Sequence, residues 1–332
     1  MHTPRLCLGK LKCSTGNATL RNTRLELTWW LESQTIKKSF GNCTMLKHLL
    51  CISILLISTW GSAAPEQRII GYSMNPGATM VREHSAKYVT DIIFFSVEPN
   101  ADGTIDQRNL SASGLEAIPE LRDKHGVQLH LAVGGWGRCT HFAAVSATAE
   151  SRAKFIAELM TLCQKHGFSG IDYDWEFPKD AKENALFADL LVESKAAFQP
   201  HDIVLSAALS PWQKLDPIVY TALDRVHLMT YDFAGRHATL GSTTLAAENF
   251  IKQGIPPENL YLGVPFYGRG IVDRDKTMGY KGIIAKHNLD PHQDEIDGMY
   301  FNGPVTIEEK ARYTKERGLG GIMIWELSQD IT

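Results

Sequence analysis

Runs of apolar and β-branched residues alternate along residues 68–325 with segments in which apolar residues recur at helical spacing. The apolar runs predict eight strands, at 68–73, 90–96, 128–133, 170–175, 203–208, 226–231, 261–266 and 321–325. The intervening segments predict helices near 112–124, 149–166, 181–198, 217–223, 245–253 and 306–317. Nearly continuous apolar strands that alternate with helices are typical of a parallel sheet. Eight such repeats in roughly 260 residues predict an α/β fold, the (β/α)8 TIM barrel.

A doubly wound open sheet is the alternative fold. Its dinucleotide-binding form needs a glycine-rich loop after the first strand, and this chain has Gly71-Tyr-Ser-Met-Asn75 there. Only seven residues follow Trp325, so we expect the eighth helix of the barrel to be missing. Truncation of the sequence is our first interpretation, and a second subunit that covers the eighth strand is the other.

The predicted fourth strand carries three acidic residues in an otherwise apolar context. Asp172, Asp174 and Glu176 alternate with Tyr173 and Trp175. Alternate residues of a strand point to the same face, roughly 6–7 Å apart. Burying three carboxyls side by side is costly unless they share protons or hydrogen bonds. An exposed edge strand would avoid this cost, but the aromatic residues fit such an edge poorly, so the pattern favours a catalytic cluster.

Residues 45–64 have the three parts of a secretory signal peptide. Lys47 and His48 form a basic start, an apolar stretch follows, and Ser62-Ala63-Ala64 is a typical cleavage site. The apolar stretch is too short to span a bilayer, which takes about 20 residues. We expect 1–44 to be an over-extended N-terminus, a long targeting extension being the alternative. The catalytic domain, 65–332, is then secreted or periplasmic, without stable membrane insertion.

The predicted mature chain is acidic and nearly free of cysteine. The whole sequence has 34 Lys and Arg against 37 Asp and Glu, and eight of the basic but two of the acidic residues lie within 1–64. This balance argues against nucleic acid or an anionic membrane as a partner. Of the six cysteines, only Cys139 and Cys163 remain, at opposite ends of a predicted helix. Their sulfurs would lie too far apart to bond, so we expect two free thiols.

Aromatic residues gather where the predicted strands end, which is where a TIM barrel places its reacting groups. Packing under loops would explain any one of them, but not the whole set. An aromatic rim around carboxylates suits sugars, whose C–H faces stack on flat apolar surfaces while their hydroxyls need polar partners. The set comprises Trp136, Trp175, Trp212 and Trp325, with Tyr72, Phe95, Tyr231, Phe233 and Tyr267 at the same level.

Five predicted strands end in short motifs. The third ends in Ala132-Val-Gly134-Gly135 and the fourth spans Ser169-Gly-Ile-Asp172-Tyr-Asp174-Trp-Glu176. The sixth, seventh and eighth carry Met229-Thr-Tyr231-Asp232, Gly263-Val-Pro-Phe-Tyr267-Gly-Arg269 and Gly321-Ile-Met-Ile-Trp325-Glu326. In order and position these motifs resemble those of the family 18 glycoside hydrolases, the chitinases and their relatives, whose signatures are Ser-x-Gly-Gly and Asp-x-x-Asp-x-Asp-x-Glu. The resemblance, to a catalytic domain of bacterial type, covers residues 68–330.

This resemblance implies a retaining hydrolysis in which the substrate supplies the nucleophile, an exception to the usual two-carboxylate scheme. Glu176 would protonate the glycosidic oxygen while the 2-acetamido carbonyl attacks its own anomeric carbon, and would then act as base toward water. Asp174 would orient the acetamido N–H. Asp172 would lie deeper and share a proton with Asp174, which keeps a proton available to Glu176 near neutral pH. No metal or other cofactor would be needed.

The resemblance also implies a set of substrate-binding residues. Tyr231 would donate a hydrogen bond to the acetamido carbonyl, and Asp232 would bind sugar hydroxyls or the acetamido edge. Trp325 would form the floor under the distorted sugar, with Trp136 on the leaving-group side. The other predicted contacts are Met229, Tyr72, Phe95, Tyr267, Arg269 and Trp212.

Three departures from the family pattern carry expectations of their own. Ser169 replaces the family's first Asp, with a small expected effect. Ala132 replaces a serine that hydrogen-bonds the inner Asp, so we expect Asp172 to lack one donor and the pH profile to change. The 53 residues between Tyr267 and Gly321 are too few for the full α+β insertion of one branch of the family. An open, shallow groove suited to endo-type cutting would follow.

The sequence thus predicts an exported endo-acting chitinase that binds chitin or other oligosaccharides containing N-acetylglucosamine and cleaves their β-1,4 links. An endo-β-N-acetylglucosaminidase for glycoproteins or peptidoglycan is the alternative with the same chemistry, because catalysis needs only the acetamido group. A non-catalytic chitin-binding lectin is the alternative from another class, although such relatives usually lose the glutamate found here as Glu176. A metal-dependent barrel enzyme is least favoured, since no histidine stands near the carboxylates at the predicted strand ends.

Overall fold

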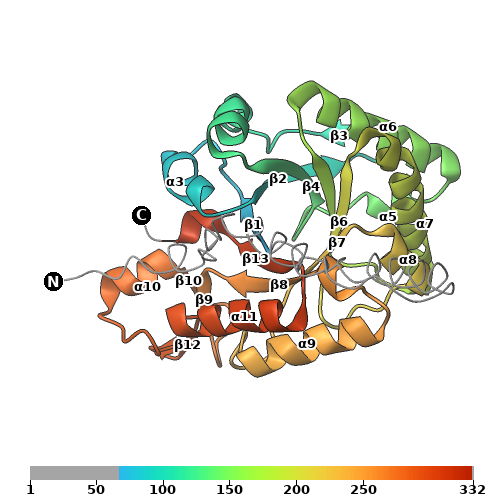
Figure 1. The fold of residues 1–332 in the computed structure, drawn as a ribbon. Coiled ribbons are helices and arrows are strands. Elements are labelled where there is room, and N and C mark those ends of the chain that lie inside the picture. Colours follow the sequence, from blue (N-terminus) through green and yellow to red (C-terminus); the bar gives the residue numbers. More distant parts are fainter. Residues whose placement is uncertain (1–66, 331–332) are drawn as a thin grey trace, which may run out of the picture. The chain divides into compact units, whose positions relative to one another are not determined.

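Eight parallel strands close into a barrel in the computed structural model, which describes residues 67–330 (Figure 1). The predicted over-extended N-terminus, 1–44, and signal peptide, 45–64, lie outside the described residues. The predicted TIM barrel is confirmed. Around the barrel, the hydrogen-bonded order is β1 (Arg68–Ser73), β13 (Gly321–Trp325), β8 (Leu260–Pro265), β7 (Arg225–Leu228), β6 (Val204–Leu209), β5 (Gly170–Asp174), β4 (Gln128–Gly134) and β2 (Asp91–Pro99), which pairs again with β1.

Three strands, β5, β7 and β8, end earlier than the sequence predicts, and the ends of β5 and β7 matter for the cleft above them. β5 ends at Asp174, so Trp175 and Glu176 begin the following loop. β7 ends at Leu228, three residues before the predicted end. Beyond it the backbone turns, since the N–H of Thr230 donates to the carbonyl of Leu228 at 2.8 Å.

Helices surround the barrel between successive strands (Figure 1). The helices at 149–166 and 181–198 have the predicted bounds. Helix α9 (Leu240–Lys252) begins five residues before the predicted start at 245, because Thr239 caps it by accepting a hydrogen bond from the N–H of Ser242. Short elements complete the layer: α3 (Thr79–Glu83), η2 (Ser85–Lys87), β3 (Ile105–Asp106), α5 (Phe142–Val145), η4 (Gln199–His201) and η5 (Pro257–Asn259). The main helices are α4 (Ala112–Glu116), which leads to the π-helical turn η3 (Glu120–Lys124), α6 (Ala149–His166), α7 (Ala181–Phe198), α8 (Pro217–Ala222), α9 (Leu240–Lys252) and α11 (Pro304–Arg317).

Alternate residues of the barrel strands face two different regions, the layer between strands and helices and the lumen of the barrel. On β5, Ile171 and Tyr173 face the helices, and the Tyr173 hydroxyl lies 2.9 Å from that of Ser194 on α7. Asp172 and Asp174 face the lumen of the barrel, as the two-residue period of the strand requires. The lumen also holds a small apolar cluster that includes Ile70 and Met323. The acidic residues of the fourth strand are therefore buried inside the barrel and not on an exposed edge.

A small antiparallel sheet follows β8. Its order is β10 (Thr277–Gly279), β9 (Tyr267–Gly270), β12 (Met299–Tyr300) and β11 (Glu295–Ile296), and helix α10 (Tyr280–Lys286) follows β10. The sequence does not predict these short strands, because two or three residues are too few to show an alternating pattern. Residues of β9 and β10 line the cleft, and the open, shallow groove stays a prediction.

Among the described residues, no α-helix follows β13, and the turn η6 (Leu327–Gln329) lies there instead. Leu327 is fully buried against β1, where a Cβ on Gly71 would lie 2.6 Å from the leucine side chain. Glycine at 71 thus allows the turn to pack closely on the strand. No helix within 67–330 is both long enough and apolar enough to cross a membrane.

Candidate functional site

A cleft of about 880 Å³ opens at the C-terminal ends of the barrel strands. Its lining combines residues of β2, β5, β6 and β13 and of the segments that follow β4 and β7 with β9 and β10 of the small antiparallel sheet. The structure thus brings together residues that are far apart in the sequence, and of the predicted site residues only Asp172 and Tyr72 do not line the cleft. Those that do are Glu176, Asp174, Met229, Tyr231, Asp232, Trp325, Trp136, Phe95, Tyr267, Arg269 and Trp212.

Asp172 lies beneath the cleft, completely buried, and accepts hydrogen bonds from three side chains. The Tyr72 hydroxyl donates to Oδ2 at 2.5 Å, the Ser206 hydroxyl donates to Oδ1 at 2.6 Å, and His227 Nδ1 lies 2.9 Å from Oδ1. Burial alone would raise the pKa of this carboxyl, but His227 and the hydrogen bonds from Ser206 and Tyr72 hold it below its ordinary value. Asp172 is therefore an ionised carboxylate.

These contacts correct two predictions. Asp172 does not lack a donor: Ala132 is its neighbour on β4, and Ser206, its neighbour on the other side on β6, supplies the serine hydroxyl. Tyr72, which is predicted to touch substrate, lies under the site with 1% of its surface exposed. Tyr72 lies on β1 below the level of the rim, so its hydroxyl contacts Asp172 instead of substrate.

Asp174 and Glu176 share a hydrogen bond at the base of the cleft. Burial, together with the charges of Glu176 and Asp172, raises the pKa of Asp174 well above its ordinary value. Burial likewise raises the pKa of Glu176 to about 7, despite a hydrogen bond from the backbone of Trp136. The proton of this acidic group therefore resides on Asp174 and Glu176, above an ionised Asp172.

The two glycines after β4 allow the loop to approach the acidic residues closely. Gly134 and Gly135 both have positive φ, 93° and 99°. A Cβ on Gly134 would lie 2.5 Å from the carbonyl oxygen of Asp174, and one on Gly135 would lie 2.1 Å from the ring of Phe95. The N–H of Gly135 donates to the same Asp174 carbonyl at 2.7 Å. Only glycine permits this backbone path without strain.

A second polar group lies on the opposite wall. Asp232 Oδ1 accepts a hydrogen bond from the Tyr267 hydroxyl at 2.6 Å and lies 3.1 Å from Arg269 Nη1. Burial alone would raise the pKa of Asp232, but His237, Tyr267 and Arg269 lower it. Tyr231 stands between this group and the acids, and its hydroxyl has a long contact, 3.9 Å, with the sulfur of Met323.

Aromatic rings form the floor and rim of the cleft. Trp325 packs on Phe95 with ring centroids 4.7 Å apart. Trp136 and Trp212 are 77% and 63% exposed, which is unusual for tryptophan and leaves flat apolar faces in solvent. Trp175, predicted as a fourth tryptophan of the rim, points outward from the barrel and is buried against α5 and α7, because it follows the inward-facing Asp174.

Other residues of the site have no signal in the sequence. Cys139 is a free thiol whose sulfur accepts the backbone N–H of Glu176 at 3.2 Å and lies 3.2 Å from the Asp174 carbonyl. Burial raises its pKa to about 12, so it stays protonated. Arg138 lies 5.0 Å from the centre of the Phe95 ring. Cys163, buried in α6, is also free, as predicted.

Within residues 67–330, no group of three or more His, Cys, Asp or Glu side chains has an arrangement that could hold a metal ion. The carboxylates at the cleft base are instead hydrogen-bonded to each other and to tyrosine, serine and histidine. The arrangement provides a proton donor, an ionised carboxylate beneath it and an aromatic floor in one cleft.

The sequence is similar to a known protein family and to several of its members. The model of the family "Glycosyl hydrolases family 18" matches residues 60–330. The chain is 23% identical over 351 residues to "Probable chitinase 2" of Drosophila melanogaster, which covers 84% of this chain and 72% of that protein. It is 30% identical over 258 residues to "Endochitinase 1" of Metarhizium robertsii, covering 60% of this chain and 61% of that one. The predicted bacterial type stays a prediction.

Solved structures share the fold. A chitinase from Bacteroides thetaiotaomicron has a TM-score of 0.73 at 22% identity, covering 80% of this chain and 92% of that one. A GH18 chitinase from Cycas revoluta in complex with (GlcNAc)3 gives 0.70 at 23%, with 79% and 96% covered. The chitinase-like agglutinin RobpsCRA from Robinia pseudoacacia gives 0.71 at 23%, also with 79% and 96% covered.

Proposed function

Since the chain belongs to the family 18 glycosyl hydrolases, we propose that it cleaves β-1,4-linked N-acetylglucosamine polymers, chitin above all, by a retaining mechanism in which the substrate acetamido group is the nucleophile. The observation that carries this proposal is the pair of Glu176 and Asp174 in the cleft, hydrogen-bonded to each other above a third, ionised carboxylate.

Glu176 is the proton donor to the glycosidic oxygen. Its pKa of about 7 leaves it about half protonated at neutral pH, which suits a group that must first give and then take a proton. Protonation of the leaving oxygen occurs while the acetamido carbonyl closes on the anomeric carbon. The glutamate then accepts a proton from the water that opens the resulting oxazolinium ring.

Asp174 holds the acetamido group in position. Its Oδ1 is buried and has no hydrogen-bond partner within the described residues, which leaves an acceptor for the acetamido N–H. The Tyr231 hydroxyl, whose one sulfur contact is long, donates to the acetamido carbonyl. Polar groups without partners in a buried site favour a ligand that supplies them, because an unpaired buried group costs about 1–3 kcal/mol. Trp325 is the apolar floor below the sugar ring.

The exposed tryptophans support a polymer as substrate. Trp136 and Trp212 extend the aromatic surface beyond the acidic pair, so that several sugar rings can stack along the groove. The chitinases among the relatives and the (GlcNAc)3 complex of the Cycas revoluta enzyme agree with this substrate class. We also propose that the protein is exported, on the signal-like segment 45–64.

A product analysis on a ladder of chitin oligomers tests the proposal. We expect internal cleavage with short oligomers as products. Release of glycans from a glycoprotein, with chitin oligomers left intact, would replace chitin by the alternative substrate. Binding without turnover, unchanged by Glu176→Gln, would place the protein with agglutinins such as the Robinia pseudoacacia relative.

A further inference from the structure

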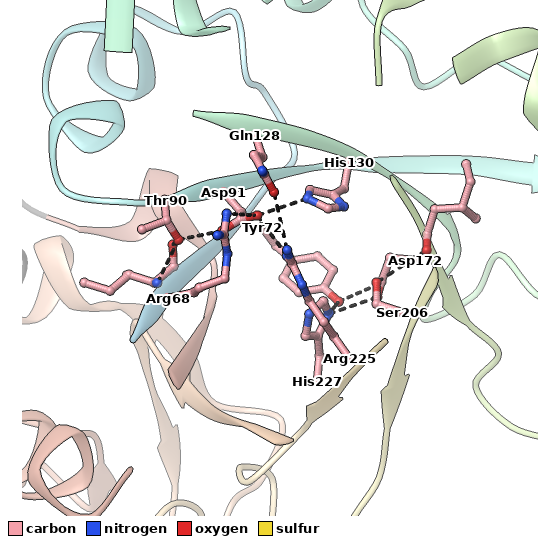
Figure 2. Close-up of polar contacts among 12 residues, drawn as sticks. Arg68, Tyr72, Thr90, Asp91, Gln128, His130, Asp172, Ser206, Arg225 and His227 are labelled. Carbon is pink, nitrogen blue, oxygen red and sulfur yellow. Dashed lines mark hydrogen bonds and ion pairs between the residues drawn. The ribbon is translucent and has the colours of Figure 1, made fainter. Parts of the chain in front are cut away.

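Polar side chains in the lumen of the barrel form two layers, a lower one around Asp91 and an upper one around Asp172, and Figure 2 shows the polar contacts of both. In the lower layer, the fully buried Asp91 is bonded by Arg68 and Arg225, each at 2.8 Å, and by His130 at 3.0 Å. Burial alone would raise the pKa of Asp91, but His130 and Arg68 hold it well below its usual range. The negative charge of Asp91 is therefore compensated within this layer.

The upper layer contains a histidine that the proposed reaction does not yet use. His227 follows Arg225 by two residues on β7, so both side chains point into the lumen. Its ring is 1% exposed and lies edge-on to the rings of Tyr72 and Tyr261. Nδ1 lies 2.9 Å from Asp172 Oδ1 and 3.1 Å from the Tyr72 hydroxyl, whereas Nε2 is buried without a partner in the described chain.

The geometry assigns the hydrogen of the imidazole to Nδ1. Asp172, when ionised, only accepts hydrogen bonds. Tyr72 already gives its single hydroxyl hydrogen to Oδ2 at 2.5 Å, so it cannot also donate to the histidine. Nδ1 must therefore carry the hydrogen that points to Oδ1. Asp172 Oδ1, at 2.9 Å, is the nearer acceptor for this N–H, and the Tyr72 oxygen lies at 3.1 Å.

On the basis of the proposed hydrolysis, we propose that His227 is a positioning residue that keeps Asp172 ionised and so holds the shared proton on Asp174 and Glu176. It touches neither the cleft nor the reacting groups. It acts through Asp172, whose negative charge in turn favours the protonated form of Asp174. If Asp172 took a proton, Asp174 would lose this neighbouring charge and ionise more readily.

The other charges that face His227 do not replace it. His130 on β4 is paired with Asp91 in the lower layer. Arg225, on the same strand as His227, also bonds Asp91. The tyrosines beside the ring are uncharged, because burial raises the pKa of Tyr72 well above its ordinary value and raises that of Tyr261 as well. Asp172 therefore depends on this one imidazole for a basic neighbour within hydrogen-bond distance.

The test is the pH dependence of kcat on a chromogenic chitin oligomer in the parent, His227→Leu and His227→Asn. Loss of the imidazole raises the pKa of Asp172, so the acidic limb of the profile moves to higher pH. Loss of one such neighbour shifts a carboxyl by about one unit, so we expect about tenfold lower activity on the acidic side for His227→Leu. His227→Asn keeps a donor, so its limb moves less.

His130→Asn is the matched control, because it removes an equally buried histidine that is bonded to Asp91 instead of Asp172. Its acidic limb stays where the parent has it. An unmoved limb in His227→Leu, or an equal shift in His130→Asn, overturns the inference and leaves the proposed hydrolysis intact. Absence of any turnover by the parent contradicts the hydrolysis itself.

A second measurement tests the role of His227 even if the parent shows no turnover or His227→Leu folds poorly. Carboxyl NMR of selectively labelled aspartate follows the titration of Asp172 in the parent and in His227→Asn, with circular dichroism to confirm folding. We expect Asp172 to titrate at higher pH in the variant. Identical titration curves would show that His227 does not set its charge.

Discussion

Replacing Lys310 by methionine should stabilise the protein at pH 7 but not at pH 10. Lys310 lies on α11 with no exposed surface, and its Nζ donates a hydrogen bond to Asn302 Oδ1 at 2.7 Å. Burial lowers the pKa of this lysine to about 7, while Asp294 partly opposes the shift. The methionine side chain fills a similar volume without a charge.

The size of the effect follows from the pKa difference. An unfolded lysine titrates at about 10.4, so the folded state binds fewer protons than the unfolded state between roughly pH 7 and pH 10. Stability therefore rises with pH across this window, and the cost of burying Lys310 is fully present below it. At about 1.4 kcal/mol per pKa unit, the cost falls by roughly 3–4 kcal/mol from pH 7 to pH 10. Loss of the Asn302 partner offsets about 1–3 kcal/mol of the gain at every pH.

Urea unfolding of the parent and of Lys310→Met at pH 7 and pH 10 measures this difference. Because the same variant is compared at both pH values, the pH-independent loss at Asn302 cancels. Lys315→Met, at an exposed position on the same helix, is the control and should show no such pH dependence. A stability difference between Lys310→Met and the parent that is equal at the two pH values would refute the reasoning.

Three further predictions concern activity. Glu176→Gln should lower kcat more than about a hundredfold. The parent should lose activity as pH rises through about 7, because Glu176 must be protonated to act. A parent activity that does not change between pH 5 and 9 would argue against Glu176 as the proton donor. Ser206→Ala should raise the pKa of Asp172 and weaken activity at acidic pH, and Ala132→Ser added to it should restore the pH profile, since both positions flank Asp172. A pH profile of Ser206→Ala equal to that of the parent would show that the serine donor is dispensable. Trp136→Ala should raise KM for long oligomers about tenfold, with kcat nearly kept, because one stacking surface is lost; an unchanged KM would exclude Trp136 from binding.

The elements with regular patterns could be predicted from the sequence. The helices 149–166 and 181–198 are found at their predicted bounds, because apolar periodicity and end signals coincide there: Thr148 caps the first, and Gly167, at φ 77°, ends it. The acids of β5 face one side, as their alternation requires. The position of the cleft follows from the barrel, since the predicted residues all lie near strand ends.

What could not be predicted depends on lateral contacts between strands. The serine for Asp172 comes from β6 instead of β4, which requires the register of both neighbours. His227 lies two residues before the motif Met229-Thr-Tyr231-Asp232 without belonging to it, and its partner Asp172 is distant in the sequence. Trp175 is predicted on the rim, although its alternation with the inward-facing Asp174 turns it outward.

The anomeric configuration of the first product is the most direct measurement of the central claim. Proton NMR of a chitin hexamer, recorded within the first minutes of hydrolysis by the parent protein, distinguishes the two anomers at the new reducing end. We expect the β-anomer to form first and to convert slowly to the equilibrium mixture, because the acetamido group attacks from one face and water from the other. An α-anomer as the first product would mean direct attack by water and would contradict the roles given to Asp174 and Glu176.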